Sequence, residues 1–171
     1  MGNKTIDEIM KLCDTLVGEH ETIRNKVGRS AESVSRQYVE WHDEFMKRYG
    51  DAIRKAVQMY RIADPRCDGE FPYLRVRVTG KDGTTYSYSG HPYEQNWEFS
   101  LYSFTPDGFS GPSTSEYYPL HGDIKDHTLP LVKGFLASIS WDACDNAVAE
   151  LMAKYANELA KRNERDVSVL K

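Results

Sequence analysis

The densest group of side chains that could do chemistry lies in the segment 121–127 of this 171-residue chain. This segment holds two histidines and two aspartates. Imidazole and carboxylate side chains can ligate divalent metals, and a bound metal would allow metal-assisted catalysis. Their spacing matches no standard metal motif and lacks the i, i+4 histidines of a helical site. A polar loop that leads into a helix is therefore the favoured interpretation, and a metal-dependent enzyme is an alternative. The candidate ligands are His121, Asp123, Asp126 and His127.

A second group is formed by arginines that alternate with aliphatic residues in the segment 71–79. A period of two is typical of a β-strand with one buried face, so Arg75 and Arg77 would share the other face. Guanidinium groups bind phosphates and carboxylates through paired N–H donors, which makes this face a candidate binding surface. The opposing interpretation is a solvated face on which the arginines pair with Glu98 and other acids across the strands.

Aromatic residues and one histidine would extend this arginine surface. Tyr73 and Tyr102 fall on the same face of the expected strands, and rings of this kind stack on bases and on guanidinium groups. Other candidates lie in a turn near residue 91 and in the long loop 105–127, where tyrosines could anchor an interface. The expected partner-binding residues are Tyr73, Arg75, Arg77, His91, Tyr102, Phe109, Tyr117 and Tyr118.

The turn at residues 80–83 decides which face the next tyrosines take. A two-residue loop would place Arg77 opposite Tyr88, whereas a three-residue loop with a glycine bulge would place Val76 opposite Tyr88. We expect the three-residue loop because it buries Tyr86 and Tyr88 with the valines, and each ring removes roughly 150–250 Å² from water. The outward face would then also carry a line of serines, Ser87, Ser89 and Ser100.

The elements that must position these residues begin with two N-terminal helices. Apolar residues recur every three or four positions over residues 6–27, which predicts an amphipathic helix. Gly28 would end this helix, and a second amphipathic helix would follow over about residues 30–63, so that the two form an antiparallel hairpin. His20 interrupts the first apolar stripe, and we expect it to be a hydrogen-bonded core or interface residue.

We expect a single α+β domain over residues 1–171, built from three parts. A helical hairpin spans 1–63, an antiparallel meander of three to four strands spans 70–119, and C-terminal helices in 128–163 pack on one face of the sheet. The fourth strand would lie at about residues 115–118. The expected helix N-caps are Thr5, in a capping box with Glu8, together with Thr128 and Ser140.

Charge and composition narrow the class of function. The net charge of −4 argues against a general nucleic-acid coat, because neutralising phosphates requires clustered cations. The N-terminus has no long apolar segment, so we expect neither a signal peptide nor a transmembrane helix, and a cytoplasmic location. The three cysteines are odd in number and widely spaced, which favours reduced structural thiols over a disulfide framework.

These patterns favour a non-catalytic binding protein that occupies a protein or ribonucleoprotein partner. Inhibition of a nucleic-acid-handling or host-defence system, as some viral proteins achieve it, is one form of this hypothesis. The alternative is a small-molecule binder that holds a nucleotide or another phosphate ligand through Arg75 and Arg77. No cofactor is expected. A homodimer through the N-terminal helices is one way to bury the apolar stripes that one small core would leave exposed.

Overall fold

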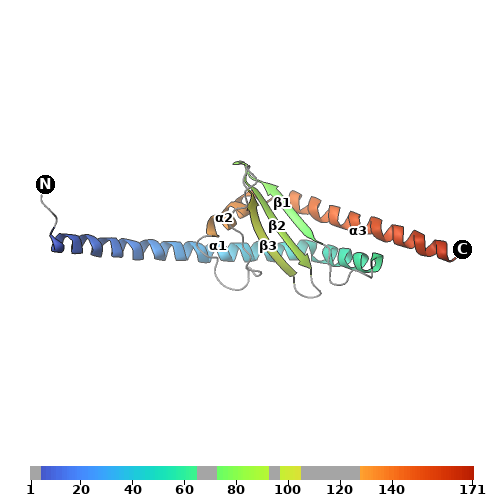
Figure 1. Cartoon of the computed structure of the whole chain (residues 1–171), viewed down its shortest axis with the longest axis horizontal. Helices are drawn as coiled ribbons and strands as arrows, with labels where there is room; N and C mark the ends of the chain where they lie inside the picture. The colour runs from blue at the N-terminus through green and yellow to red at the C-terminus, as the bar shows by residue number, and fades with distance from the viewer. Residues whose placement is uncertain (1–4, 65–72, 93–96, 105–127) are drawn as a thin grey trace.

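The computed structural model describes residues 5–64, 73–92, 97–104 and 128–171. This part of the chain forms three helices and a three-stranded antiparallel sheet with strand order β1-β2-β3 (Figure 1). The predicted α+β fold is therefore confirmed, whereas the strand expected at 115–118 lies outside the described residues. In chain order the elements are α1 (Ile6–Ala63), β1 (Leu74–Thr79), β2 (Thr85–Pro92), β3 (Trp97–Phe104), α2 (Leu129–Ser138) and α3 (Trp141–Val169).

The N-terminal part of the fold is one helix, and the prediction of a helical hairpin was wrong. α1 runs without a break for 58 residues, which is about 87 Å at 1.5 Å per residue. A glycine inside a helix costs only about 1 kcal/mol relative to alanine, and α1 contains no proline. The apolar spacing also keeps its phase across Gly28, from Ile23 and Val27 to Val34. Continuous intrahelical hydrogen bonding therefore outweighs the local preference of Gly28 for a helix end.

Two of the three predicted N-caps form hydrogen bonds at the starts of their helices. Thr5 Oγ1 accepts a hydrogen bond from the Glu8 backbone N–H (3.3 Å), and Glu8 Oε2 accepts one from the Thr5 N–H (3.2 Å), which completes the capping box. Ser140 Oγ accepts a hydrogen bond from the Ala143 N–H (3.2 Å) at the start of α3. The side chain of Thr128 makes no capping hydrogen bond to α2. α3 continues to Val169, beyond the expected end of the C-terminal helices at residue 163.

The β1–β2 hairpin has the predicted three-residue loop. The Gly83 N–H donates to the Gly80 carbonyl (3.1 Å), and the Gly80 N–H donates to the Thr84 carbonyl (2.7 Å). Gly83 adopts φ = 82°, the left-handed conformation that a glycine bulge requires. The resulting register pairs Val76 with Tyr88. It therefore places the tyrosines of β2 on the same face as the valines of β1.

The helices form a layer against the apolar face of the sheet. α3 runs alongside the second half of α1 in the same direction: Trp141 at its start contacts Trp41, with ring centroids 5.9 Å apart, and Tyr155 contacts Tyr60 at 4.9 Å. The N-terminal part of α1 projects beyond the sheet, and the two chain ends lie at opposite ends of an elongated molecule (Figure 1). None of the described helices contains a segment long and apolar enough to cross a bilayer.

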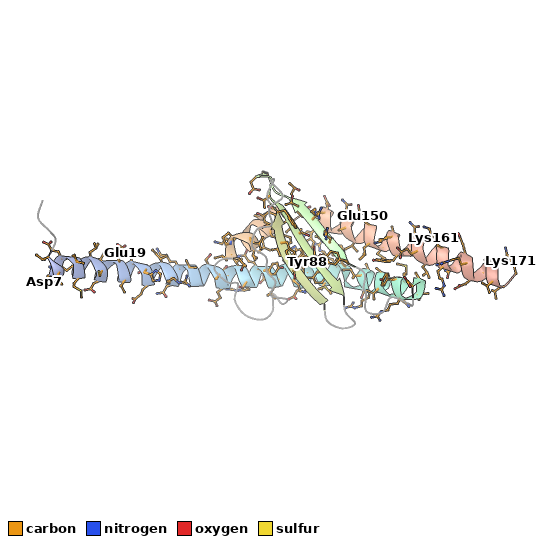
Figure 2. The ribbon with its side chains drawn as sticks, in the orientation of Figure 1. Asp7, Glu19, Tyr88, Glu150, Lys161 and Lys171 are labelled. Carbon is orange, nitrogen blue, oxygen red and sulfur yellow. The ribbon has the colours of Figure 1, made fainter. Side chains whose placement is uncertain are left out.

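Tyr88 is the central residue of the core, and it lies where the sheet crosses α1 (Figure 2). Its ring is fully buried, meets Trp41 edge-on and stacks on Phe99, each with centroids 4.7 Å apart. Its hydroxyl is hydrogen-bonded to Nδ1 of His42 in α1. Burial raises the pKa of Tyr88 and lowers the pKa of His42, so both side chains are neutral in the folded protein at neutral pH.

Gly134 in α2 lies so close to the ring of Tyr86 that a side chain cannot be added there without movement. A Cβ at this position would overlap the Tyr86 hydroxyl and lie 2.8 Å from its Cζ. We expect Gly134→Ala to lower the free energy of unfolding by about 1–3 kcal/mol, as over-packing of a core does. Urea denaturation would show this as a lower transition midpoint with an unchanged slope.

Gly28→Ala is the matched control, because a Cβ at this helical glycine meets nothing within 4 Å. The control should stabilise α1 by up to about 1 kcal/mol through helix propensity. Tyr86→Phe removes the overlapping oxygen and should restore part of the stability that Gly134→Ala loses. If both glycine substitutions changed stability equally, the steric explanation would fail.

His42 should make the stability of the fold depend on pH below neutrality. Its pKa is lowered in the folded state, so below the ordinary histidine pKa of about 6.5 the unfolded chain binds more protons than the folded chain. The free energy of unfolding should therefore fall as the pH decreases from about 7 to about 5. Chemical denaturation across this range measures the slope, and His42→Asn, which cannot be protonated, should reduce it. An unchanged slope would assign the dependence to other groups.

Candidate functional site

The candidate functional site is the face of the sheet that points away from the helices, and we call it the outer face. Side chains alternate along β1, so Arg75 and Arg77 point to the face opposite the buried side chains of Leu74 and Val76. The strand pairing forms two rows across the sheet, one starting at each arginine. Together with the residue before β1, the outer face brings together Tyr73, Arg75, Arg77, Ser87, Ser89, Ser100 and Tyr102.

The two arginines are exposed and lie side by side. Residues two apart on a strand are separated by about 6.6 Å, so the two positive charges repel each other. The guanidinium carbon of Arg75 lies 5.1 Å from the centroid of the Tyr73 ring, a cation–π contact that orients this side chain. Within the described ranges, no carboxylate forms an ion pair with either arginine. Glu98, the expected partner, lies in β3 opposite His91, but its side chain is not among those that the structure describes.

The serines in the middle of the outer face are shielded from solvent. Ser87 and Ser89 are only 2% and 3% exposed, and their Oγ atoms are hydrogen-bonded at 2.7 Å. The register places both serines on the same face as the arginines, as predicted, although they are closed to solvent. β2 is the central strand, so short side chains on it are flanked by neighbours from β1 and β3. The outer face thus consists of a cationic edge on β1, a closed middle, and Tyr102 on β3.

Several predicted site residues cannot be placed relative to the arginines. His91 lies in β2, paired with Glu98, and not in a turn as expected, but its side chain is outside the described part. No group of three or more potential metal ligands occurs among the described residues. The loop metal site thus remains a prediction. The other predicted residues outside the described ranges are Phe109, Tyr117, Tyr118, His121, Asp123, Asp126 and His127.

Buried polar groups of the helices contribute to packing. The Tyr49 hydroxyl contacts the carboxylate of Asp145 and also donates to the backbone carbonyl of Trp141 (3.3 Å). Burial, followed by the nearby Asp145 charge, raises the pKa of the Cys144 thiol to about 12. A nucleophilic thiol requires the opposite shift. The helical pattern of α3 places Asp145 on the polar side, so sequence alone gave no signal of its contact with Tyr49.

Neither of two hollows lined by described residues includes an arginine of the outer face. The larger, of about 590 Å³, lies where the β1–β2 turn meets α2 and is lined by Lys81, Asp82, Tyr86 and Ser138 among others. Asp82 accepts a hydrogen bond from the Thr84 N–H (3.0 Å), which lowers its pKa and stabilises the turn. The smaller, of about 360 Å³, lies between the end of α1 and Arg162.

If the outer face is a binding surface, its arginines should contribute little to folding. We expect Arg75→Ala and Arg77→Ala to change the free energy of unfolding by less than about 0.5 kcal/mol, as exposed substitutions usually do. Leu74→Ala on the same strand is the control, because this fully buried side chain should cost about 2–5 kcal/mol. Thermal and urea denaturation distinguish the two cases. A loss above 1 kcal/mol in either arginine variant would indicate a structural role instead.

The outer face therefore combines two exposed arginines with tyrosines on either side of a closed central strand. Comparisons with protein-family models, with curated proteins and with solved structures give no significant match to this chain. The function has to be inferred from the chemistry of this surface and from the shape of the molecule.

Proposed function

We propose that this chain is a non-catalytic, cytoplasmic binding protein whose outer face occupies an anionic surface of a macromolecular partner. The observation that carries the proposal is the exposed pair Arg75 and Arg77, held side by side on β1. A carboxylate or phosphate between the two guanidinium groups would relieve their repulsion and accept several charge-assisted hydrogen bonds. Tyr73 and Tyr102 add the aromatic contact area that is typical of protein interfaces.

A protein or ribonucleoprotein fits this surface better than a small molecule does. Sites for small molecules are concave and enclose most of the ligand. The arginines lie on a sheet face, and neither hollow lined by described residues reaches them. Carboxylates of an acidic protein and phosphates of a ribonucleoprotein can both approach such a face. By blocking that anionic surface, this chain would inhibit the protein or ribonucleoprotein to which the surface belongs.

The state of the buried reactive groups also favours binding over catalysis. The Cys144 thiol has a raised pKa of about 12, which disfavours the nucleophilic thiolate. The hydroxyl of Tyr88 and the ring of His42 are hydrogen-bonded to each other inside the core, away from any substrate. On the outer face, by contrast, the two arginines are exposed to a partner.

The proposal predicts that reversing the charge of the outer face abolishes partner capture. Immobilised wild-type protein should recover one specific macromolecule from a lysate of the source cells. Arg75→Glu/Arg77→Glu should reduce this recovery by about tenfold or more, because arginines at interface centres are energetic hot spots worth at least 1–2 kcal/mol each. Quantitative mass spectrometry of the captured material measures the loss.

Lys133→Glu/Lys161→Glu provides the matched control, since it changes the net charge equally at exposed positions on α2 and α3. The control should capture the partner as well as the wild type does. Equal recovery with both double variants would disprove the role of the outer face. Calorimetry against a nucleotide panel tests the competing function: heat that disappears in Arg75→Ala/Arg77→Ala would favour a phosphate ligand over a macromolecule.

A further inference from the structure

The first part of α1 carries an apolar stripe that nothing in the chain covers. Every residue from 6 to 26 is exposed, and the first fully buried residue of α1 is Ala31. We call residues 6–26 the arm. Asp7 and Glu19 mark it in Figure 2, where it projects beyond the sheet and the other helices. Its large exposed apolar side chains are Ile6, Ile9, Met10, Leu12, Leu16, Val17 and Ile23.

The arm has the pattern of a coiled-coil helix. With Ile6 at heptad position a, apolar residues occupy the a and d positions except at His20, and positions b, c and f hold only polar residues and Gly18. The apolar side chains of such a seam are removed from water only when a second helix packs on it. The seam residues are Ile6, Ile9, Cys13, Leu16, His20, Ile23 and Val27.

We propose that the arm pairs with the arm of a second copy of this chain, with the two helices antiparallel. The seam continues in phase into Val34 and Trp41, which are buried under the sheet and α2 of the same chain. In a parallel pair the second helix would have to pass through the space that this core already fills. In an antiparallel pair the arm of the second copy lies only along the arm of the first. The core of the second copy then lies beyond the N-terminus of the first copy.

Charge also favours the antiparallel arrangement. Residues 6–16 carry Asp7, Glu8 and Asp14 against Lys11, whereas residues 17–29 carry Glu19 and Glu21 against three cations. Antiparallel pairing places the acidic first part of each arm beside the weakly basic second part of the other and opposes the two helix dipoles. A parallel pair would offer two symmetric Glu19–Arg24 contacts between chains but would align the acidic first parts of the two arms. The cations are Arg24, Lys26 and Arg29.

Pairing a positions with d positions over residues 6–30 of the two copies sets the register. It places Leu16 opposite His20 of the second copy, Cys13 opposite Ile23, and Ile9 opposite Val27. Glu19 then meets its own equivalent near the two-fold axis, and this repulsion is a cost of the antiparallel register. A membrane surface is a poorer occupant, because interfacial helices carry mainly Lys and Arg on the polar face and the polar face of the arm carries Asp7, Glu8, Asp14 and Glu21.

The arm should be necessary for dimerisation and unnecessary for folding. Light scattering coupled to size-exclusion chromatography should give the mass of two chains for the wild type and of one chain for Leu16→Glu/Ile23→Glu. Thr15→Glu/Thr22→Glu adds the same charges to the opposite side of the arm and should remain dimeric. All three proteins should share one near-ultraviolet circular dichroism spectrum. A monomeric wild type, a trimer, or loss of the dimer in the threonine variant would overturn the proposal.

Disulfide trapping tests the direction of the helices. In a Cys67→Ser background, diamide should not link Cys13 of two chains, whereas adding Ile23→Cys should give a linked dimer, because only residues with Cα atoms within about 7 Å form a disulfide. Cys144 is buried and should not react. Thr22→Cys, which points away from the seam, is the control and should give no linked dimer. A Cys13–Cys13 bond in the absence of the added cysteine would show parallel arms and overturn the proposal.

Discussion

The fold depends on the burial of Tyr88 between the sheet and α1. Its ring contacts aromatic side chains from three elements, namely Trp41 of α1, Phe99 of β3 and Phe135 of α2. Such pairs contribute about 0.5–1.5 kcal/mol each beyond the area they bury. The hydroxyl at the end of the ring would be costly to bury alone, and its hydrogen bond to His42 removes that cost. One residue therefore joins the layers and also fixes which helix position meets the sheet.

The same constraint determines what the outer face can be. Because side chains alternate along a strand, a register that buries Tyr88 beside Val76 also turns Arg75 and Arg77 toward solvent. A slip of one residue would place Arg77 opposite Tyr88, so that burying Tyr88 would also bury an unpaired charge, which is very unfavourable. The turn around Gly83 sets the β1–β2 register, and that register determines both the packing of the core and the cationic edge of β1.

Much of this architecture could be predicted from the sequence because it rests on local rules. The alternation in β1, the glycine turn and the caps at Thr5 and Ser140 are each specified by neighbouring residues. The continuity of α1 across Gly28 could not be predicted in this way, since a glycine is compatible with both a helix end and a helix interior. The burial of Ser87 and Ser89 could not be predicted either, because the alternation within β2 assigns them only to the outward face.

The uninterrupted backbone of α1 has a kinetic consequence for its first turns. Starting a helix in water is unfavourable because several residues must be ordered before the first hydrogen bond forms. Here the core holds the second half of α1 in helical form, so the preceding turns grow from a ready-made nucleus and need only propagation. They can fray from the N-terminus and re-form rapidly while the rest of the molecule stays folded. The two halves of one helix can thus differ widely in lifetime although no residue marks a boundary between them.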